Sequence, residues 1–204
     1  MRAIMLPAAI GVVALIGAAA VWLATRPSGV ELSPAMLNVQ NAEIGGPFEL
    51  TKHTGERMTS DAIIDGPTLV YFGYTYCPDV CPFDVQVMVD TVDILAEKGI
   101  EVTPVFITVD PARDTADELS DYVEAMHPNL VALTGTQEEI AEVAKTYKVY
   151  YSQVNVPDSE ADYLMQHTAF TYLMTPDHNL AAMFRNQHPA DQIASDVERV
   201  LNAL

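Results

Sequence analysis

Apolar and polar positions after residue 43 alternate in a way that predicts strands and helices in turn along the chain. The runs 68–75 and 101–109 are rich in apolar, aromatic and β-branched residues, which is typical of strands buried on both faces of a sheet. Residues 82–98 between them are predicted to form a helix that ends at Gly99. This order predicts two parallel neighbouring strands with a helix packed against them.

Helix-start signals and turn residues predict the remaining elements. Thr115 with Glu118, and Thr136 with Glu139, have the spacing of a capping box, so a helix is predicted to follow each threonine. The further predicted elements are a hairpin at 48–51 and 56–59, strands at 130–133 and 149–156, a hairpin at 168–174 and 180–185, and a helix at 189–204.

This order of elements predicts an α/β protein with a thioredoxin-like fold and extra β-hairpins. A strand–helix–strand unit is followed by a helix, a β-hairpin and a closing helix, which is the thioredoxin plan with strands added. The polar stretch 157–166 is predicted to be a loop that leads into His167. In this plan we expect the chemistry where the first central strand ends and its helix begins.

The N-terminal residues have a different pattern. Residues 3–25 are 23 positions without a charged side chain, and about 20 such residues can span a bilayer as a helix. We predict an anchor with one transmembrane helix at 1–25, an irregular linker at 26–42 and the thioredoxin-like domain at 43–204. A cleaved signal peptide is the alternative, because Ala18–Ala20 offers small residues to a peptidase. The positive-inside rule favours a domain outside the cytoplasm.

The charge distribution narrows the class of partner. The chain carries a formal net charge of −18, and the residues after Arg26 hold 8 Lys and Arg against 28 Asp and Glu, a net charge of −20. This argues against a nucleic-acid partner, because phosphate binding needs positive charge. The acidic excess suits solubility, a basic protein partner or a cation.

The two cysteines, Cys77 and Cys81, lie where the chemistry is expected, within the stretch YFGYTYCPDVCPFDVQVM. Pro82 is predicted to be the first helical residue, which makes Cys81 the cap residue and places Cys77 in the preceding loop. A helix N-terminus lowers the pKa of a thiol. The nearby carboxylates of Asp79 and Asp84 act against a bare thiolate and would favour a bound cation.

Three kinds of chemistry fit this cysteine pair from the residues alone. The pair could form a structural disulfide, although so short a loop gains the least stability from closure. It could exchange electrons with the thiols or disulfide of a partner. It could also bind a metal ion: zinc would need two more ligands, whereas Cu(I) accepts two thiolates and one imidazole.

His167 is the best candidate for a third ligand. It immediately precedes a predicted buried strand, and in a thioredoxin-like fold this position faces the cysteine turn, although a purely structural role fits it equally well. The remaining histidines are predicted to be surface or capping residues, namely His53, His127, His178 and His188. Four methionines could be soft copper ligands but are more simply explained as core residues, namely Met88, Met165, Met174 and Met183.

The chain resembles the Sco (SenC) family in three motifs, FGYTYCPDVCP, PVFITVDPARDTADELSDYVEAMHPNLVALTG and YLMQHTAFTYLMTPD, which occur in this order. Members of this family are membrane-anchored, thioredoxin-like copper proteins used in building cytochrome c oxidase. The resemblance runs from about residue 43 to the C-terminus, and the predicted anchor agrees with it. The combination of motifs is specific, whereas any one of them alone would not be.

The resemblance implies which residues bind copper. By position, the copper-binding cysteines of the family fall on Cys77 and Cys81, its copper-binding histidine falls on His167, and its loop aspartate falls on Asp79. Family members commonly have Asp before the histidine, and this chain has Gln166 instead. An amide can accept a hydrogen bond but brings no charge, which puts in doubt the affinity for cupric copper while leaving the three ligands in place.

The resemblance also implies a copper metallochaperone rather than a turnover enzyme, with the binuclear copper site of cytochrome c oxidase subunit II as the recipient. Another copper chaperone or a thioredoxin-like reductant is a further implied partner. The alternative function is a membrane-anchored thiol–disulfide oxidoreductase that reduces the recipient's cysteines. A peroxiredoxin-like peroxidase would need an arginine to activate a thiolate, for which Arg113 is the candidate.

The N-terminus also bears on the compartment. It lacks an Arg-rich presequence, which favours the inner membrane of a bacterium, with the domain in the periplasm, over the mitochondrial inner membrane.

Overall fold

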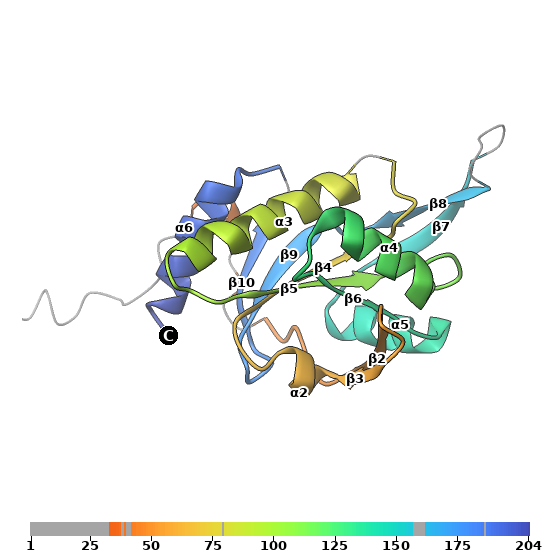
Figure 1. Ribbon diagram of the computed structural model, residues 1–204, viewed down its shortest axis with the longest axis horizontal. Helices are drawn as coiled ribbons and strands as arrows, with labels where there is room; N and C mark the ends of the chain where they lie inside the picture. The colour runs from red at the N-terminus through yellow and green to blue at the C-terminus, as the bar shows by residue number, and fades with distance from the viewer. Residues whose placement is uncertain (1–32, 38, 40–41, 79, 157–161, 186) are drawn as a thin grey trace, which may run out of the picture. The chain divides into compact units, whose positions relative to one another are not determined.

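A mixed eight-stranded β-sheet forms the centre of the computed structural model, which describes residues 33–204 except 38, 40–41, 79, 157–161 and 186 (Figure 1). Across the sheet the strands are β1 (Met36–Leu37), β10 (Leu180–Arg185), β9 (Phe170–Met174), β4 (Thr68–Gly73), β5 (Thr103–Thr108), β6 (Val131–Thr134), β2 (Glu49–Lys52) and β3 (Arg57–Thr59). A second sheet has two strands, β7 (Tyr151–Asn155) and β8 (Tyr163–His167).

The two apolar runs of the sequence are central strands of the large sheet, as predicted. β4 and β5 run parallel, with Val70 opposite Val105, and every side chain of β4 is buried. β6 continues the parallel arrangement beyond β5, whereas β9 pairs with the other side of β4 in the antiparallel direction. Strands covered on both faces need apolar residues at successive positions, which explains why these runs do not alternate.

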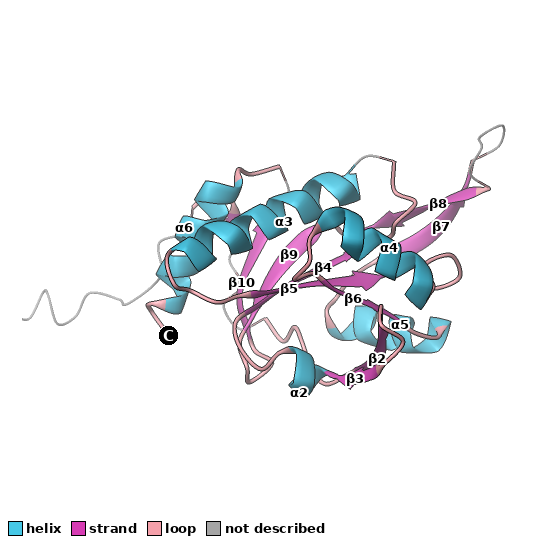
Figure 2. Cartoon of the chain, in the orientation of Figure 1, coloured by secondary structure: helices cyan, strands magenta, loops and turns pink. Residues whose placement is uncertain are grey.

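Helices cover both faces of this sheet. They are α2 (Ser60–Ile63), α3 (Val80–Glu97), α4 (Ala116–Met126), α5 (Gln137–Thr146) and α6 (Ala190–Leu201). Figure 2 shows α3, α4 and α6 on one side of the sheet and α5 on the other. The chain therefore has the thioredoxin-like α/β fold that the element order predicts, with the hairpins β2–β3 and β7–β8 added to it.

The predicted helix boundaries agree with the local chemistry. Thr136 and Glu139 form a complete capping box at the start of α5. The Thr115 side chain accepts a hydrogen bond from the backbone N–H of Glu118 at the start of α4. Gly99 follows the end of α3 with a φ of 77°, a left-handed conformation that glycine adopts without strain.

Several elements differ from the sequence-based prediction, and the short helix α2 was not predicted at all. α3 begins at Val80, so Cys81 lies inside the first turn and not at the cap position. β8 begins at Tyr163, within the stretch predicted to be a loop, and β1 lies within the predicted linker 26–42. β8 pairs only with β7 in the described part of the chain and is partly exposed on both faces, so it shows no clear alternation. β1 has two residues, too few for any periodicity.

The predicted transmembrane helix at 1–25 lies outside the described residues. Among the residues that the structure does describe, no helix is both long enough and apolar enough to cross a membrane. The division into anchor, linker and domain therefore stays a prediction.

Candidate metal centre

The cysteine turn begins directly beyond the carboxyl end of β4. Cys77 lies in the loop and is partly exposed, whereas Cys81 lies in the first turn of α3 and is fully buried. Neither cysteine is in a disulfide. The backbone N–H of Cys81 donates a hydrogen bond to the Cys77 sulfur over 3.4 Å. The loop and the helix start therefore hold both sulfurs on the same side of the turn.

His167 reaches this turn from the other sheet. It is the last residue of β8, and its Nε2 atom lies 3.1 Å from the Cys81 sulfur. The two sulfurs and the imidazole nitrogen all lie within 4.8 Å of one another. The structure thus brings together the three side chains that were predicted to bind copper, from segments 86 residues apart in the sequence.

The hydrogen bonds of His167 select one tautomer of its ring. Nδ1 lies 3.0 Å from the carbonyl oxygen of Thr168. A carbonyl can only accept, so Nδ1 carries the proton and the neutral ring presents the lone pair of Nε2 to the cysteines. The ring also meets the rings of Tyr71 and Tyr74 edge to face, with centroids 6.2 and 5.9 Å away. These contacts orient the imidazole as a ligand for a metal ion.

The electrostatics of the metal-free site keep Cys81 protonated. The hydrogen bond with the Cys77 sulfur and then burial raise the pKa of the Cys81 thiol. Burial and the charge of the neighbouring Cys77 also raise the pKa of Tyr74 to about 12. Burial, followed by the neighbouring Cys81, raises the pKa of Tyr71 as well. A cation that takes up the Cys81 sulfur must therefore displace a proton.

The polar residues predicted to lie beside the three candidate ligands have different environments. Asp84 is buried and accepts a hydrogen bond of 3.0 Å from the Tyr71 hydroxyl, so it supports the ring that lies behind Cys81. Asp79, the predicted loop aspartate, lies outside the described residues. Gln166 is exposed and lines the groove beside His167.

A residue that the sequence did not single out holds the cysteine loop in place. Asp114 is fully buried and accepts hydrogen bonds from the backbone N–H and hydroxyl of Thr75, at 3.0 and 2.5 Å. It also accepts one from the Thr108 hydroxyl at 2.5 Å. Asp114 lies in the VDPARDT motif, which carried the family resemblance but no predicted role of its own. The signal in the sequence that could have found it is an acidic residue shortly after Thr108, at the end of a predicted buried strand.

An apolar groove opens beside the three candidate ligands. It has a volume of about 510 Å³ and runs from the cysteine loop to the β7–β8 hairpin. The groove is lined by Tyr74, Cys77, Pro78, Val80, Val154, Val156, Leu164, Met165, Gln166 and His167. A ligand or partner can therefore reach Cys77 and His167 through largely apolar surroundings.

Apart from Met165, the other candidate ligands do not line this groove. His53 accepts a hydrogen bond from the backbone of Ala132, and His127 accepts one from the backbone of Asn129. His178 lies 2.8 Å from a carboxylate oxygen of Asp61. Two of the methionines, Met88 and Met174, are buried, Met183 is partly buried in β10, and Met165 lines the groove.

Comparison with known proteins identifies a family for most of the chain. The family model described as SCO1/SenC matches residues 38–202. Protein SenC of Rhodobacter capsulatus is 43% identical over 164 residues, which cover 80% of this chain and 73% of SenC. The mitochondrial SCO1 homolog 1 of Arabidopsis thaliana is 41% identical over 157 residues, or 76% of this chain, and the match spans about half of that relative, 46%.

A solved structure shows the same fold. The crystal structure of Arabidopsis thaliana ScoI with copper bound is 40% identical in sequence and superposes with a TM-score of 0.73. The match covers 78% of this chain and 99% of the solved one.

Proposed function

This chain belongs to the SCO1/SenC family, and from that premise we propose that it is a copper metallochaperone for the assembly of cytochrome c oxidase. Its cargo is one copper ion, held by Cys77, Cys81 and His167. The recipient is the binuclear copper site of oxidase subunit II. The observation that carries the proposal is the convergence of two sulfurs, from the turn after β4, and one imidazole nitrogen, from the end of β8, within 4.8 Å.

The donor set suits copper better than a hard cation. Two thiolates and one neutral imidazole are soft to intermediate ligands, which favour Cu(I) over Mg²⁺ or Ca²⁺. Zinc at a structural site takes four ligands, and the group found among the described residues has three. A homologous ScoI structure contains copper, which supports the same cargo here.

The chain's own residues set the conditions for uptake and release. Cys81 must lose its proton before its sulfur can bind, because its pKa is raised in the metal-free protein. Both cysteines must be reduced, and disulfide formation between them would remove two of the three ligands. Release is therefore favoured by protonation or oxidation of the pair.

The location of the protein is part of the proposal. An N-terminal anchor at 1–25 and a linker at 26–42 tether the domain at 43–204 to the bacterial inner membrane, on the periplasmic side. The tether places donor and recipient on one membrane and so raises their effective concentration. The protein should remain in the membrane fraction after alkaline extraction; recovery in the soluble fraction would contradict the anchor.

Metal analysis of the reduced domain tests the cargo. We expect about one Cu(I) per chain, and X-ray absorption should show two sulfur ligands and one nitrogen ligand. His167→Ala should remove the nitrogen contribution, while His127→Ala is the matched control because His127 lies away from the cysteine turn. Unchanged copper retention and ligand numbers in His167→Ala would overturn the ligand assignment.

A thiol–disulfide reductase is the second candidate, favoured by the contact between the backbone of Cys81 and the Cys77 sulfur within a single turn. In that reaction, the two thiols of this chain become a disulfide. Two electrons and two protons pass to a disulfide of the recipient, which becomes two thiols. This function does not require His167. An oxidase-assembly assay separates the two: a chaperone fails with either His167→Ala or Cys77→Ser, whereas a reductase fails only with Cys77→Ser.

A further inference from the structure

The three candidate ligands are carried by two separate sheets. The cysteines follow β4 of the eight-stranded sheet, whereas His167 ends β8 of the two-stranded sheet (Figure 1). Within the described part of the chain, β8 forms ladder hydrogen bonds with β7 and with no other strand. Contacts between the histidine strand and the cysteine turn are therefore made by side chains, as the rings of Tyr71 and Tyr74 do with His167.

Arg113 contacts the start of the histidine strand in several ways. Its Nη1 donates a hydrogen bond of 3.1 Å to the carbonyl oxygen of Tyr163, the first residue of β8. Its guanidinium carbon lies 3.7 Å from the centre of the Tyr163 ring. Its Nε donates to Asp110 over 2.6 Å, and the other oxygen of Asp110 accepts from the Tyr163 hydroxyl over 2.9 Å. Arg113 and Asp110 thus bind both the backbone and the side chain of Tyr163.

The same guanidinium faces the cysteine loop. It lies 4.8 Å from the ring centre of Tyr76, the residue before Cys77, and 5.8 Å from that of Tyr74. Tyr74 in turn meets the ring of His167 edge to face, with ring centroids 5.9 Å apart. Arg113 therefore lies between the loop that carries Cys77 and the strand that carries His167.

We infer that Arg113 is a positioning residue of the metal centre, which holds the histidine strand so that His167 stays within reach of Cys81. It acts through Tyr163 and Tyr74, which it contacts directly. β8 is an extended strand of five residues from Tyr163 to His167, so contacts that fix Tyr163 at its start constrain the position of His167 at its end. The inference rests on the proposed copper function and adds to it the residue that closes the site.

The chemistry of the contact requires arginine. A planar guanidinium can donate to a carboxylate and a carbonyl at once while stacking on an aromatic ring, and a lysine ammonium cannot reproduce this geometry. Arg113→Lys should therefore keep the positive charge beside Asp110 but lose part of the hydrogen bonding and stacking that hold Tyr163.

The first test needs no metal. Amide hydrogen exchange at residues 163–167 of the reduced, copper-free protein should accelerate about tenfold or more in Arg113→Met, as expected for loss of a charge-assisted hydrogen bond. The control is Arg185→Met, because Arg185 holds the edge strand β1 through the carbonyl oxygens of Pro34 and Met36. It should leave exchange in β8 unchanged. Unchanged exchange in Arg113→Met would overturn the inference.

The second test is a double-mutant cycle on copper affinity with Arg113→Met and His167→Ala. Loss of a residue that orients a metal ligand typically weakens binding about 10- to 100-fold. We expect this loss for Arg113→Met in the native background and almost none once His167 is absent. Equal losses in the two backgrounds would assign Arg113 a general structural role and contradict the inference. If His167→Ala itself leaves affinity unchanged, the proposed ligand set fails instead.

A third variant keeps the inference testable if Arg113→Met does not fold. Tyr163→Leu removes the partner ring and hydroxyl while leaving Arg113 and Asp110 paired with each other. It should reduce the nitrogen contribution in X-ray absorption while both sulfurs remain. A full complement of one nitrogen and two sulfurs in Tyr163→Leu would contradict the inference.

Discussion

Gly73, the last residue of β4, leaves almost no space around Cys81. A Cβ atom at this position would lie 2.8 Å from Cε1 of Tyr71, 3.0 Å from Cε2 of Phe106 and 3.2 Å from the Cys81 sulfur. All three neighbours are fully buried. Rings packed this tightly cannot move away without disturbing the core.

Gly73→Ala should therefore destabilise the protein and also displace the cysteine. Overpacking of a core typically costs about 1 to 3 kcal/mol of unfolding free energy, which denaturant unfolding can measure. We also expect weaker copper binding, because Cys81 would be pushed from its position opposite His167. Gly66→Ala is the control, since a Cβ there would meet nothing within 4 Å. Equal stability of the two variants would contradict this account of Gly73.

Asp114 should give the protein a specific pH dependence. Burial raises the pKa of its carboxyl above the ordinary value. Between the unfolded pKa of about 4 and the raised folded value, the folded state binds this proton more tightly, so the contribution of Asp114 to stability falls as pH rises. The stability advantage of the native protein over Asp114→Asn should therefore shrink from acid to neutral pH. An advantage that grows with pH, measured by urea unfolding, would mean that the folded pKa is lowered.

Much of the site, but not all, could be predicted from individual residues. The pair Cys77 and Cys81 and the partner His167 were predicted because their residue types and order are informative. Arg113 was considered only as a thiolate activator, yet the structure places it against Tyr163 and Asp110. Contacts between segments 50 residues apart leave no periodic signal in a single sequence.

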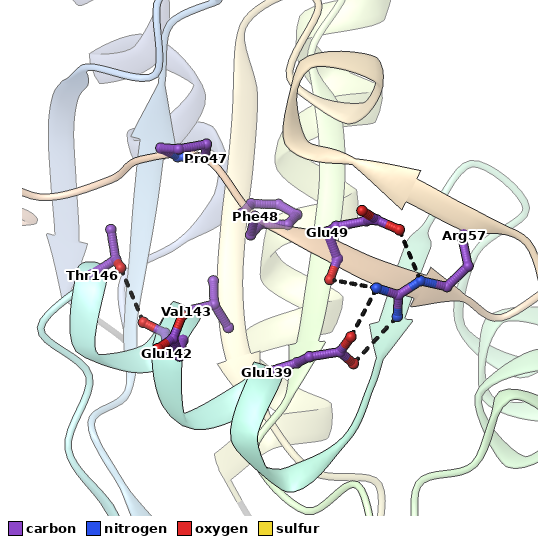
Figure 3. Close-up of a pocket in the computed structure, with 8 residues that line it drawn as sticks. All are labelled: Pro47, Phe48, Glu49, Arg57, Glu139, Glu142, Val143 and Thr146. Atoms are coloured by element: carbon purple, nitrogen blue, oxygen red, sulfur yellow. Dashed lines mark hydrogen bonds and ion pairs between the residues drawn. The ribbon is translucent and has the colours of Figure 1, made fainter.

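At the scale of elements, α5 and the β2–β3 hairpin are joined through one carboxylate. Figure 3 shows Arg57 of β3 directed at Glu139 of α5 and at Glu49 of β2. Arg57 Nη2 lies 2.8 Å from Glu139, whose other oxygen accepts from the backbone of Thr136 at 2.8 Å. Glu139 thus serves the helix cap and the hairpin contact together.

Glu139→Ala should cost more stability than Arg57→Met. The first change removes half of a capping box, and loss of a cap costs about 1 kcal/mol. The second removes ion pairs of a side chain that is 43% exposed, and exposed pairs contribute about 0 to 1 kcal/mol. Chemical denaturation at low and high salt should show this order; high salt should weaken the Arg57 effect and only the ion-pair part of the Glu139 effect, because the cap hydrogen bond is not screened in the same way. The reverse order would mean that the ion pair, and not the cap, stabilises the helix start.

An element could be predicted where the residues that stabilise it lie close to it in the sequence, and not where they lie far away. Capping boxes and two-sided burial are local properties, so α4, α5, β4 and β5 could be predicted. β8 depends on pairing with β7 and on side chains from outside its own sheet. β1 depends on β10, from which it is separated by nearly the whole domain. The element that carries His167 was therefore the hardest to predict.

For the whole molecule, the order of elements was enough to predict the fold but not how its parts close on the metal centre. The thioredoxin-like plan follows from buried runs and caps that recur along the chain. Where β8 meets the cysteine turn, Arg113 contacts both Tyr163 and Tyr74, and Tyr74 contacts His167. These contacts act between the two sheets, so one bound ion would link both.

Copper should consequently stabilise the entire fold and not only the cysteine turn. A ligand at about 100 times its dissociation constant adds about 2.7 kcal/mol when it binds only the folded state. For a domain of this size that corresponds to a rise in Tm of about 5 to 11 °C. Calorimetry of the reduced protein should show the full rise, and His167→Ala a smaller one because the ion no longer links the two sheets.

The variant with both Cys77→Ser and Cys81→Ser should show no rise in Tm with copper, because it keeps only the imidazole of the three candidate ligands. Serine is close to cysteine in size, so this variant tests the sulfur ligands with little change in packing at the turn. If copper raised its Tm as much as that of the native protein, the stabilising ion would have to bind elsewhere. The acidic surface, with its net charge of −20 after Arg26, would then be the place to search.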